Sequence, residues 1–382
     1  MRFLTAGESH GKGLIAVIED MPAGLELTAD YINNMLAERQ KGYGRGQRMS
    51  IEKDEVEILS GVRNGKTIGS PISLYIKNRD WENWKDIMKV KAGVSTPGIK
   101  LPRPGHADLC GILKYGFNDI RNVIERASAR ETAIRVAVGA CAKRLLEEFQ
   151  IDVLGFVVEL GAIKTNIKKM DFLKIKYAIS KSKLRCPDKN SEIKMIKKID
   201  LAKKKGDTLG GIFEIRAINV PLGLGTYSQW DERLNAKLSY ALMSIPAVKG
   251  VEIGLGFDYA KNFGSAVHDK IFYKNSRGYY RLTNNAGGIE GGISNGEEII
   301  LKAVMKPIAT LRKPLSSVNI DTKKKSIAHI ERSDVTAVAS ASVVGEAVVA
   351  WTLAQAMNKK FGGDNIREMK ENYKHFLRNI AK

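Results

Sequence analysis

The central stretch of the sequence spans residues 126 to 149 and opens with Arg126-Ala127-Ser128-Ala129-Arg130-Glu131-Thr132. Ser128 and Glu131 have the spacing of a capping box. In that motif the hydroxyl accepts the amide of the third helical residue, and the carboxylate reaches back to the cap amide. The pattern therefore predicts a helix that begins at Ala129 and ends near Phe149.

The start of this helix is a candidate anion site. Free amides and the positive end of the helix dipole favour an anion there, and Arg126 and Arg130 add two fixed positive charges. The residues thus predict a site for a phosphate or a carboxylate. The alternative is an ordinary capped helix whose arginines are solvated.

Length and composition indicate a folded chain with a large core, because 43% of its 382 residues are hydrophobic. The formal net charge of +20 suits nucleic acid, an anionic membrane or a small acidic substrate. Much of the excess is lysine between residues 164 and 205, which predicts two surface helices with solvated faces. Because no recognised nucleic-acid module accompanies these lysines, we expect no nucleic-acid partner.

Cysteine usage and hydropathy indicate a cytoplasmic protein. Cys110, Cys141 and Cys186 are odd in number and lack metal-ligand spacing, so neither disulfides nor a metal site is expected. The first residues contain no apolar stretch long enough for a signal peptide. The most apolar run, 335–351, is short for a membrane span and contains Glu346, so it is interpreted as a buried helix.

Apolar runs and turn residues predict both helices and strands. The predicted strands cover 14–19, 56–60, 70–76, 152–163, 209–220, 248–254 and 299–305, with a hairpin formed by 271–273 and 279–282. Further helices are predicted at 29–39, capped by Thr28, at 231–244 and at 335–357. Residues 78–111 have little periodicity, and a loop of that length inside a compact chain is usually functional.

Neither of two common nucleotide-binding motifs is indicated by the sequence. The segment Gly61 to Thr67 follows a strand as a P-loop does, but its spacing fails by one residue and a second strand follows where a helix is required. A hairpin turn fits better. No glycine-rich Rossmann fingerprint lies between a strand and a helix.

Two histidines lie in turns bounded by glycine or proline. His10 belongs to Gly7-Glu8-Ser9-His10-Gly11, and His106 belongs to Arg103-Pro104-Gly105-His106-Ala107-Asp108. Glycine lets the backbone approach a ligand closely, so both histidines are candidate functional groups. The alternative for each is a structural histidine satisfied by a neighbouring group.

Two further segments resemble ligand-binding loops. Residues 39–48 form a basic, glycine-rich loop of the kind that closes over anions, although an exposed linker is the alternative. Residues 284–296 are rich in glycine beside an apolar strand, which indicates backbone packed against something planar or phosphorylated.

Together the motifs resemble the chorismate synthase family, and the resemblance extends from Gly7 to Ala347. It is carried, in the family's order, by Gly-Glu-Ser-His-Gly at 7–11, Arg-Pro-Gly-His-Ala-Asp at 103–108, Ser-Ala-Arg-Glu-Thr-Ala at 128–133, Gly-Gly-Ile-Ser-Asn-Gly at 291–296 and Arg-Ser-Asp at 332–334. Departures from the family pattern occur at Asp20, Ala127, Pro246 and Ser333. Pro246 removes a side-chain amide from the expected flavin pocket.

The resemblance implies an α+β fold in which a helical layer is sandwiched between two antiparallel sheets, as a single domain over residues 1–382 and a homotetramer. It implies 1,4-elimination of phosphate from 5-enolpyruvylshikimate 3-phosphate to give chorismate, in the shikimate pathway. The reaction would require reduced FMN without net redox change, with reducing equivalents ultimately from NADPH. Because no reductase domain is visible, an external flavin reductase is the expected partner.

The resemblance also assigns site residues. The implied catalytic residues are His10, His106 and Asp334. The implied substrate-binding residues are Ser9, Arg39, Arg45, Arg48, Arg103, Ser128, Arg130 and Arg332. The implied FMN-binding residues are Arg126, Ala127, Ser128, Ala247, Gly291, Lys306, Pro307, Ile308, Ala309, Thr310 and Arg332. The substrate's phosphate and two carboxylates match this arginine charge. Asp334 is expected at the start of the helix that follows it.

A rival hypothesis from another class is a basic RNA-binding protein that uses the 39–48 loop and the lysine-rich helices. That hypothesis predicts steep salt dependence and no flavin.

Overall fold

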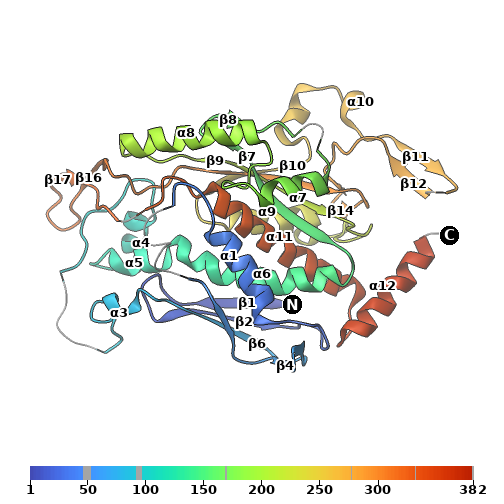
Figure 1. Ribbon diagram of the computed structural model, residues 1–382, viewed down its shortest axis with the longest axis horizontal. Coiled ribbons are helices and arrows are strands. Elements are labelled where there is room, and N and C mark those ends of the chain that lie inside the picture. Colours follow the sequence, from blue (N-terminus) through green and yellow to red (C-terminus); the bar gives the residue numbers. More distant parts are fainter. Residues whose placement is uncertain (46–52, 92–96, 168–169, 277, 332, 381–382) are drawn as a thin grey trace.

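The computed structural model describes residues 1–45, 53–91, 97–167, 170–276, 278–331 and 333–380. Two antiparallel sheets enclose a layer of helices (Figure 1). This is the α+β sandwich that the sequence predicts, and the prediction is confirmed.

The first sheet has the strand order β1-β2-β6-β3. Its strands are β1 (Arg2–Ala6), β2 (Gly13–Glu19), β6 (Ile72–Lys77) and β3 (Val56–Ile58). Leu14, Ala16 and Ile18 are fully buried, whereas Ile15 and Val17 between them are exposed. This alternation follows from the two-residue period of a strand, and it turns one face of the sheet towards the helices.

The second sheet has the strand order β10-β15-β9-β7-β8. Its strands are β10 (Val248–Ile253), β15 (Ile299–Met305), β9 (Gly211–Ile218), β7 (Asp152–Leu160) and β8 (Ile163–Lys164). In β7, Leu154 and Phe156 pack against α7 (Phe172–Ser180), while Val153 and Val157 join the main core. Strand β7 is therefore buried on both faces.

The helical layer contains α1 (Ala29–Gln40), α6 (Thr132–Glu147), α9 (Leu234–Met243) and α11 (Val338–Phe361). Helix α6 lies against β2 and β6, helix α11 lies against β7 and β9, and the two helices pack on each other. Gly139 makes this contact close: a Cβ atom built there would lie 2.4 Å from the Cβ atom of Ala347. The helices thus connect the two sheets.

The remaining elements surround this sandwich. They are α3 (Trp81–Trp84), α4 (Asp108–Tyr115), α5 (Arg121–Arg126), α8 (Lys189–Lys205), α10 (Gly264–Val267), α12 (Ile366–Ile380), β4 (Val62–Arg63), β5 (Lys66–Thr67), β11 (Ile271–Lys274), β12 (Gly278–Arg281), β13 (Ile289–Glu290), β14 (Ile293–Ser294), β16 (Ser316–Val318) and β17 (Lys325–Ile327). The pair β4–β5 confirms the hairpin predicted in place of a P-loop. Helices α7 and α8 confirm the two helices predicted for the lysine-rich segment.

One predicted helix start is confirmed only in part, since Ser128 caps a helical turn at Ala129 but the capping box is absent, and a second predicted start is wrong. The Ser128 hydroxyl accepts the amide of Arg130, 3.2 Å away, and the Glu131 carboxylate accepts the hydroxyl of Thr5. The predicted capping box therefore does not form; a 3₁₀ turn covers Ala129–Glu131, and α6 begins at Thr132. Likewise α11 begins at Val338, so Asp334 lies before the helix and does not cap it.

Other differences concern elements with weak local signals. Strand β1 and helix α12 were not predicted, and the predicted 78–111 loop contains α3 and the first residues of α4. Helix α11 is long and apolar enough to cross a membrane, but 94% of its most apolar window is buried between the sheets. Its hydropathy is explained by its place in the core, as the sequence predicts.

We predict that Gly139→Ala destabilises the fold. Alanine normally stabilises a helix relative to glycine by about 0.5–1 kcal/mol, but here its methyl group would collide with Ala347. Overpacking of this kind costs about 1–3 kcal/mol, so the melting temperature should fall rather than rise.

The matched control is the double variant Gly139→Ala with Ala347→Gly, which returns the space to the contact. Its melting temperature should exceed the value expected from adding the effects of the two single variants. A Gly139→Ala variant that melts at a higher temperature than the original chain would contradict the assigned contact.

Candidate active site

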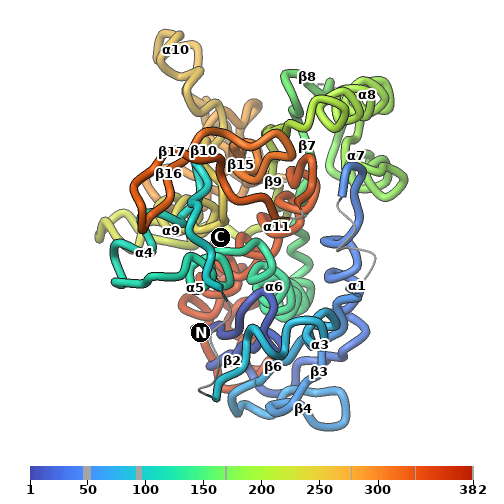
Figure 2. Tube along the Cα trace, turned by 90° about the vertical axis from the view of Figure 1, so that its left-hand side faces the viewer, coloured from blue at the N-terminus to red at the C-terminus, as the bar shows by residue number. Residues whose placement is uncertain are grey.

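A cavity of about 460 Å³ lies at one end of the helical layer. Figures 1 and 2 show that end, where α4 and α5 lie near the β16–β17 hairpin although they are far apart in the sequence. Backbone bonds connect the segment before α4 to this region, because Ile320 donates to Lys100 and His329 donates to Leu101. Segments from both halves of the chain thus enclose one site.

His10 forms one wall of the cavity. The residue is 6% exposed, its Nδ1 atom lies 2.8 Å from Glu125 Oε1, and its backbone amide donates to Glu125 Oε2 at 2.7 Å. The imidazole stacks on the Trp84 ring, with centroids 3.9 Å apart. Asn78 supports the turn by donating to the carbonyl oxygens of Glu8 and Gly11. The turn therefore holds the histidine in one orientation.

His106 faces the same cavity and is held by Asp108. Its Nδ1 atom lies 2.5 Å from Asp108 Oδ1, and Arg103 donates from its Nε atom to Asp108 Oδ2 at 2.8 Å. Arg103 also donates to the hydroxyl of Thr310 at 2.9 Å. Burial acts to raise the pKa of Asp108, but the hydrogen bonds and charges of His106 and Arg103 outweigh it and hold that pKa well below its usual range. The carboxylate is thus ionised and fixes both side chains.

Two buried arginines share another carboxylate. Arg39 and Arg130 both pair with Asp54, and all three side chains are almost fully buried. Arg39 also donates to Thr132 at 3.1 Å, and Arg130 donates to Asn78 at 2.9 Å. Burial lowers the pKa of Arg39 to about 10 while the charge of Asp54 opposes this shift, so Arg39 stays protonated at neutral pH. These contacts present two oriented guanidinium groups to the cavity.

Asp334 and Arg45 meet at the cavity wall. The Nε atom of Arg45 lies 3.3 Å from Asp334 Oδ2, and Arg45 also contacts Ser340 at the start of α11. Neighbouring Ser333 donates to the carbonyl oxygen of Thr310. The segment before α11 is therefore bonded to Thr310, which follows β15, and to Arg45, which follows α1.

Another side of the cavity is mostly apolar. It is lined by Ile124, Ala127, Pro246, Ala247, Met305, Pro307, Ile308, Ala309 and Ala337. Ala247 adopts a positive φ of 69°, and its carbonyl oxygen accepts the amide of Lys306 at 3.0 Å. The ammonium group of Lys306 contacts the carbonyl oxygen of Gly105. The cavity thus joins an apolar wall to a cationic one.

Most of the predicted site residues line this cavity. They are Ser9, His10, Arg39, Arg45, Arg103, His106, Ala127, Ser128, Arg130, Ala247, Lys306, Pro307, Ile308, Ala309, Thr310 and Asp334. Arg126 instead donates to the carbonyl oxygens of Gly7 and Thr5. Gly291 lies between β13 and β14 and is not among the residues that line the cavity. Arg48 and Arg332 lie outside the described residues.

Sequence reasoning missed the groups that hold these side chains in place. Glu125, Asp54 and Asn78 are buried and contact cavity residues, and Trp84 stacks on His10. Their partners lie far away in the sequence, so no local motif marks them. Asp108 is the exception, because it lies within the same short motif as Arg103 and His106.

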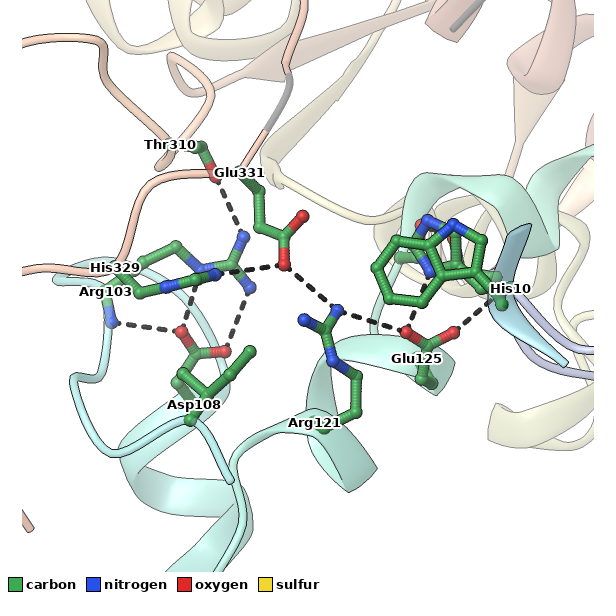
Figure 3. A network of polar contacts seen from close by, with 12 residues as sticks. His10, Arg103, Asp108, Arg121, Glu125, Thr310, His329 and Glu331 are labelled. Carbon is green, nitrogen blue, oxygen red and sulfur yellow. Dashed lines mark hydrogen bonds and ion pairs between the residues drawn. The ribbon is translucent and has the colours of Figure 1, made fainter. Parts of the chain in front are cut away.

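Glu331 adds a negative charge to the cavity wall. Burial acts to raise its pKa, but the hydrogen bond from His329 and the charge of Arg121 outweigh burial and lower the pKa to about 2. Arg121 lies between Glu331 and Glu125, at 3.0 Å and 3.4 Å from the two carboxylates (Figure 3). The Arg121 guanidinium thus lies between two carboxylates, that of Glu331 in the cavity wall and that of Glu125 behind His10.

Comparisons with known proteins agree with this site. A sequence model of the chorismate synthase family matches residues 1–358. A protein of Desulforudis audaxviator named chorismate synthase is 53% identical over 382 residues, covering 100% of this chain and 98% of its own. One of Desulforamulus reducens with the same name is 56% identical over 373 residues, covering 97% and 96%.

The fold agrees as well. A crystal structure described as that of a chorismate synthase has a TM-score of 0.81 and 43% identity, covering 100% of this chain and 98% of its own. The family match spans almost the whole length, and it includes the segments that form the cavity. The chain therefore belongs to the chorismate synthase family, the lyases that act in the shikimate pathway.

Proposed function

We propose that this enzyme converts 5-enolpyruvylshikimate 3-phosphate to chorismate and phosphate by a 1,4-elimination that requires reduced FMN. The observation that carries the proposal is a single cavity lined by arginines and by apolar side chains, in which two histidines are each held by a carboxylate. The rival RNA-binding hypothesis gains no support from this arrangement, since the arginines are buried in a cavity and not spread over a surface.

The cationic wall fits the substrate's charge. The substrate carries a phosphate and two carboxylates, and Arg39, Arg45, Arg103 and Arg130 supply matching charge within one cavity. Asp54 and Asp108 hold three of these guanidinium groups before any ligand arrives. Preorganised cations favour developing negative charge without the cost of reorientation.

The reaction breaks the bond between carbon 3 and the phosphate oxygen and removes a hydrogen from carbon 6. His10 is proposed to donate a proton to the departing phosphate, because its imidazole faces the cavity from a buried turn. Asp334 is proposed to act in removing the hydrogen at carbon 6. His106 is proposed to stabilise negative charge beside the flavin-binding wall.

The side chains that line the cavity are suited to binding FMN. Small and apolar side chains around Ala247 and the 307–309 segment leave a wall that a flat ring can contact, and Lys306 lies at its edge. Pro246 lacks the side-chain amide common in the family, yet it still lines the cavity next to Ala247. Reduced FMN, when bound, supplies electron density for the elimination and is unchanged over the full cycle.

Several wider properties belong to the same proposal. We infer one catalytic domain over residues 1–382, a homotetramer, a cytoplasmic location and an external reductase that draws on NADPH. Support for self-association comes from the outer face of the first sheet, where Leu4, Ile15 and Val17 are exposed next to one another on paired strands.

The proposed activity is tested by anaerobic assay of the purified chain with 5-enolpyruvylshikimate 3-phosphate and chemically reduced FMN. We expect release of phosphate and formation of chorismate in equal amounts, and no turnover with oxidised FMN. The control omits flavin. Absence of phosphate release with reduced FMN would overturn the proposal.

We predict that the substrate-bound protein binds reduced FMN more tightly than oxidised FMN. The reduced flavin carries additional negative charge, and the four arginines of the cavity favour it. The difference should be at least about tenfold, which corresponds to about 1.4 kcal/mol. Titration of both redox forms in the presence of substrate measures it, and equal affinities would contradict the prediction.

Asp334→Asn should bind FMN and substrate but turn over more slowly by about a hundredfold or more. The amide keeps the size of the side chain and can still contact Arg45, but it is no longer a base. Ligand titration and single-turnover rates on one preparation separate binding from chemistry.

The matched control for this variant is Asp200→Asn. Asp200 accepts the hydroxyl of Tyr43 on a neighbouring part of the fold and lies away from the cavity. The control should retain its rate. If Asp334→Asn turned over as fast as the control, Asp334 would have no catalytic role.

A further inference from the structure

Glu125 lies directly behind His10. Its carboxylate belongs to α5, is 3% exposed and sits behind the described residues that line the cavity. Both carboxylate oxygens accept hydrogen bonds from His10: Oε2 from the backbone amide at 2.7 Å and Oε1 from the Nδ1 side at 2.8 Å. Its backbone carbonyl accepts the amide of Ser9. Glu125 thus holds the side chain and the backbone of this turn, and we call its contacts with Ser9 and His10 the clamp.

These two bonds determine which imidazole nitrogen carries a proton. A carboxylate only accepts hydrogen bonds, so the Nδ1 atom of His10 must hold a hydrogen to bond with it. The Nε2 atom has no hydrogen-bond partner among the residues that the structure describes, and His10 lines the cavity. The nitrogen available to a bound ligand is therefore Nε2.

The ring orientation is fixed from a second direction. The imidazole stacks on Trp84 at an angle of 24°, and the Arg121 guanidinium lies 4.9 Å from the centre of the same indole ring. Stacking restrains tilting of the imidazole, while the bond to Glu125 restrains rotation in its plane. Together they leave little freedom for His10.

Opposite charges balance the buried carboxylate. Arg121 lies 3.4 Å from Glu125 and 3.0 Å from Glu331, and His329 lies 3.1 Å from Glu331 (Figure 3). A buried charge is costly unless it is paired and hydrogen-bonded. The chain from His329 to Glu125 provides that pairing, and it ties α5 to the 329–331 segment.

We propose that Glu125 is the positioning residue of His10. It holds one hydrogen on Nδ1 and directs Nε2 into the cavity. In the imidazolium form, which carries a second hydrogen on Nε2, that second hydrogen goes to the leaving phosphate, and the neutral ring protonated on Nδ1 remains. The chain of Arg121, Glu331 and His329 holds Glu125 in place. This inference rests on the proposed function for the role of His10, while the geometry of the clamp can be tested without it.

The variant Glu125→Gln separates these roles because it keeps the size of the side chain. An amide has one accepting oxygen, yet His10 presents two donors to this position. The backbone amide cannot give up its hydrogen, so the amide oxygen stays with it and the NH₂ group faces Nδ1. Nδ1 then accepts a hydrogen bond and carries no hydrogen, so the neutral ring has its only hydrogen on Nε2. Giving that hydrogen to the phosphate would leave an imidazolate, which makes the ring a much weaker acid.

The experiment is NMR spectroscopy of the full chain labelled with ¹⁵N-histidine, without substrate or flavin. The five histidines make assignment feasible, and the His10 signals are those absent from the His10→Ala spectrum. We expect a downfield, solvent-protected Nδ1 proton for His10 in the original chain and its loss in Glu125→Gln. Its absence in the original chain, or its persistence in Glu125→Gln, would overturn the proposal.

A kinetic measurement gives the functional readout. In Glu125→Gln we expect kcat to fall about a hundredfold or more while KM changes less than about threefold, because Glu125 does not line the cavity. A merely structural role would lower the melting temperature and both parameters together. If the Nδ1 proton were lost and kcat stayed unchanged, the contact between Glu125 and His10 would be confirmed. The proposed role of His10 in the reaction would be overturned.

Two further variants keep the result interpretable. Glu125→Asp retains the charge one methylene further from His10, so it should keep the Nδ1 proton and recover part of kcat. If Glu125→Gln does not fold, Glu125→Asp gives the test by itself: the Nδ1 proton should remain while kcat falls below that of the original chain, and an unchanged kcat would overturn the positioning role. Glu147→Gln is the matched control: it removes a carboxylate that accepts the Tyr31 hydroxyl at 2.6 Å on α6, and the His10 signals and kcat should not change.

Discussion

The close approach of α6 and α11 is the contact on which the rest of the structure depends. Where Gly139 meets Ala347 there is no room for another methyl group, so the two helices touch almost backbone to backbone. Each helix then covers its own sheet. The segments that precede the helices, around Ser128 and Asp334, consequently open onto the same cavity although about two hundred residues separate them. The site is thus a consequence of how the core is packed.

Packing alone would leave several like charges beside one another in that cavity. The structure resolves this with buried carboxylates that lie behind the arginines: Asp54 between Arg39 and Arg130, and Asp108 beside Arg103. Each carboxylate reduces the repulsion and fixes the guanidinium direction. Ion pairs of this kind add little to stability on balance, because desolvation offsets their attraction. Their contribution is a set of cations oriented before a ligand binds.

The family resemblance carried by the sequence motifs predicted the sandwich and most of the cavity-lining residues, and several single elements were predicted from local signals. Strand β15 was predicted at its observed bounds from its run of apolar residues, and the motif at 103–108 placed His106 beside Asp108. The predicted capping box does not form because a tertiary contact replaces it. Glu131 accepts a hydrogen bond from Thr5 of β1 instead of one from the backbone amide of Ser128. Glu125 could not have been predicted, since its partner His10 lies 115 residues away.

The two histidines of the cavity differ in a way that follows from these carboxylates. Asp108 divides its hydrogen bonds between His106 and Arg103, and the His106 side chain is 21% exposed, so this imidazole is partly hydrated and shares its carboxylate with a guanidinium group. Glu125 gives both its oxygens to His10, whose side chain is 7% exposed and whose ring lies against an indole. Interactions with a charged ligand are stronger where water is excluded. The orientation of the His10 ring is therefore fixed, with Nε2 directed into the cavity. His106 instead shares the Asp108 carboxylate with the Arg103 guanidinium. Two imidazoles of identical chemistry are thereby suited to different steps of one elimination.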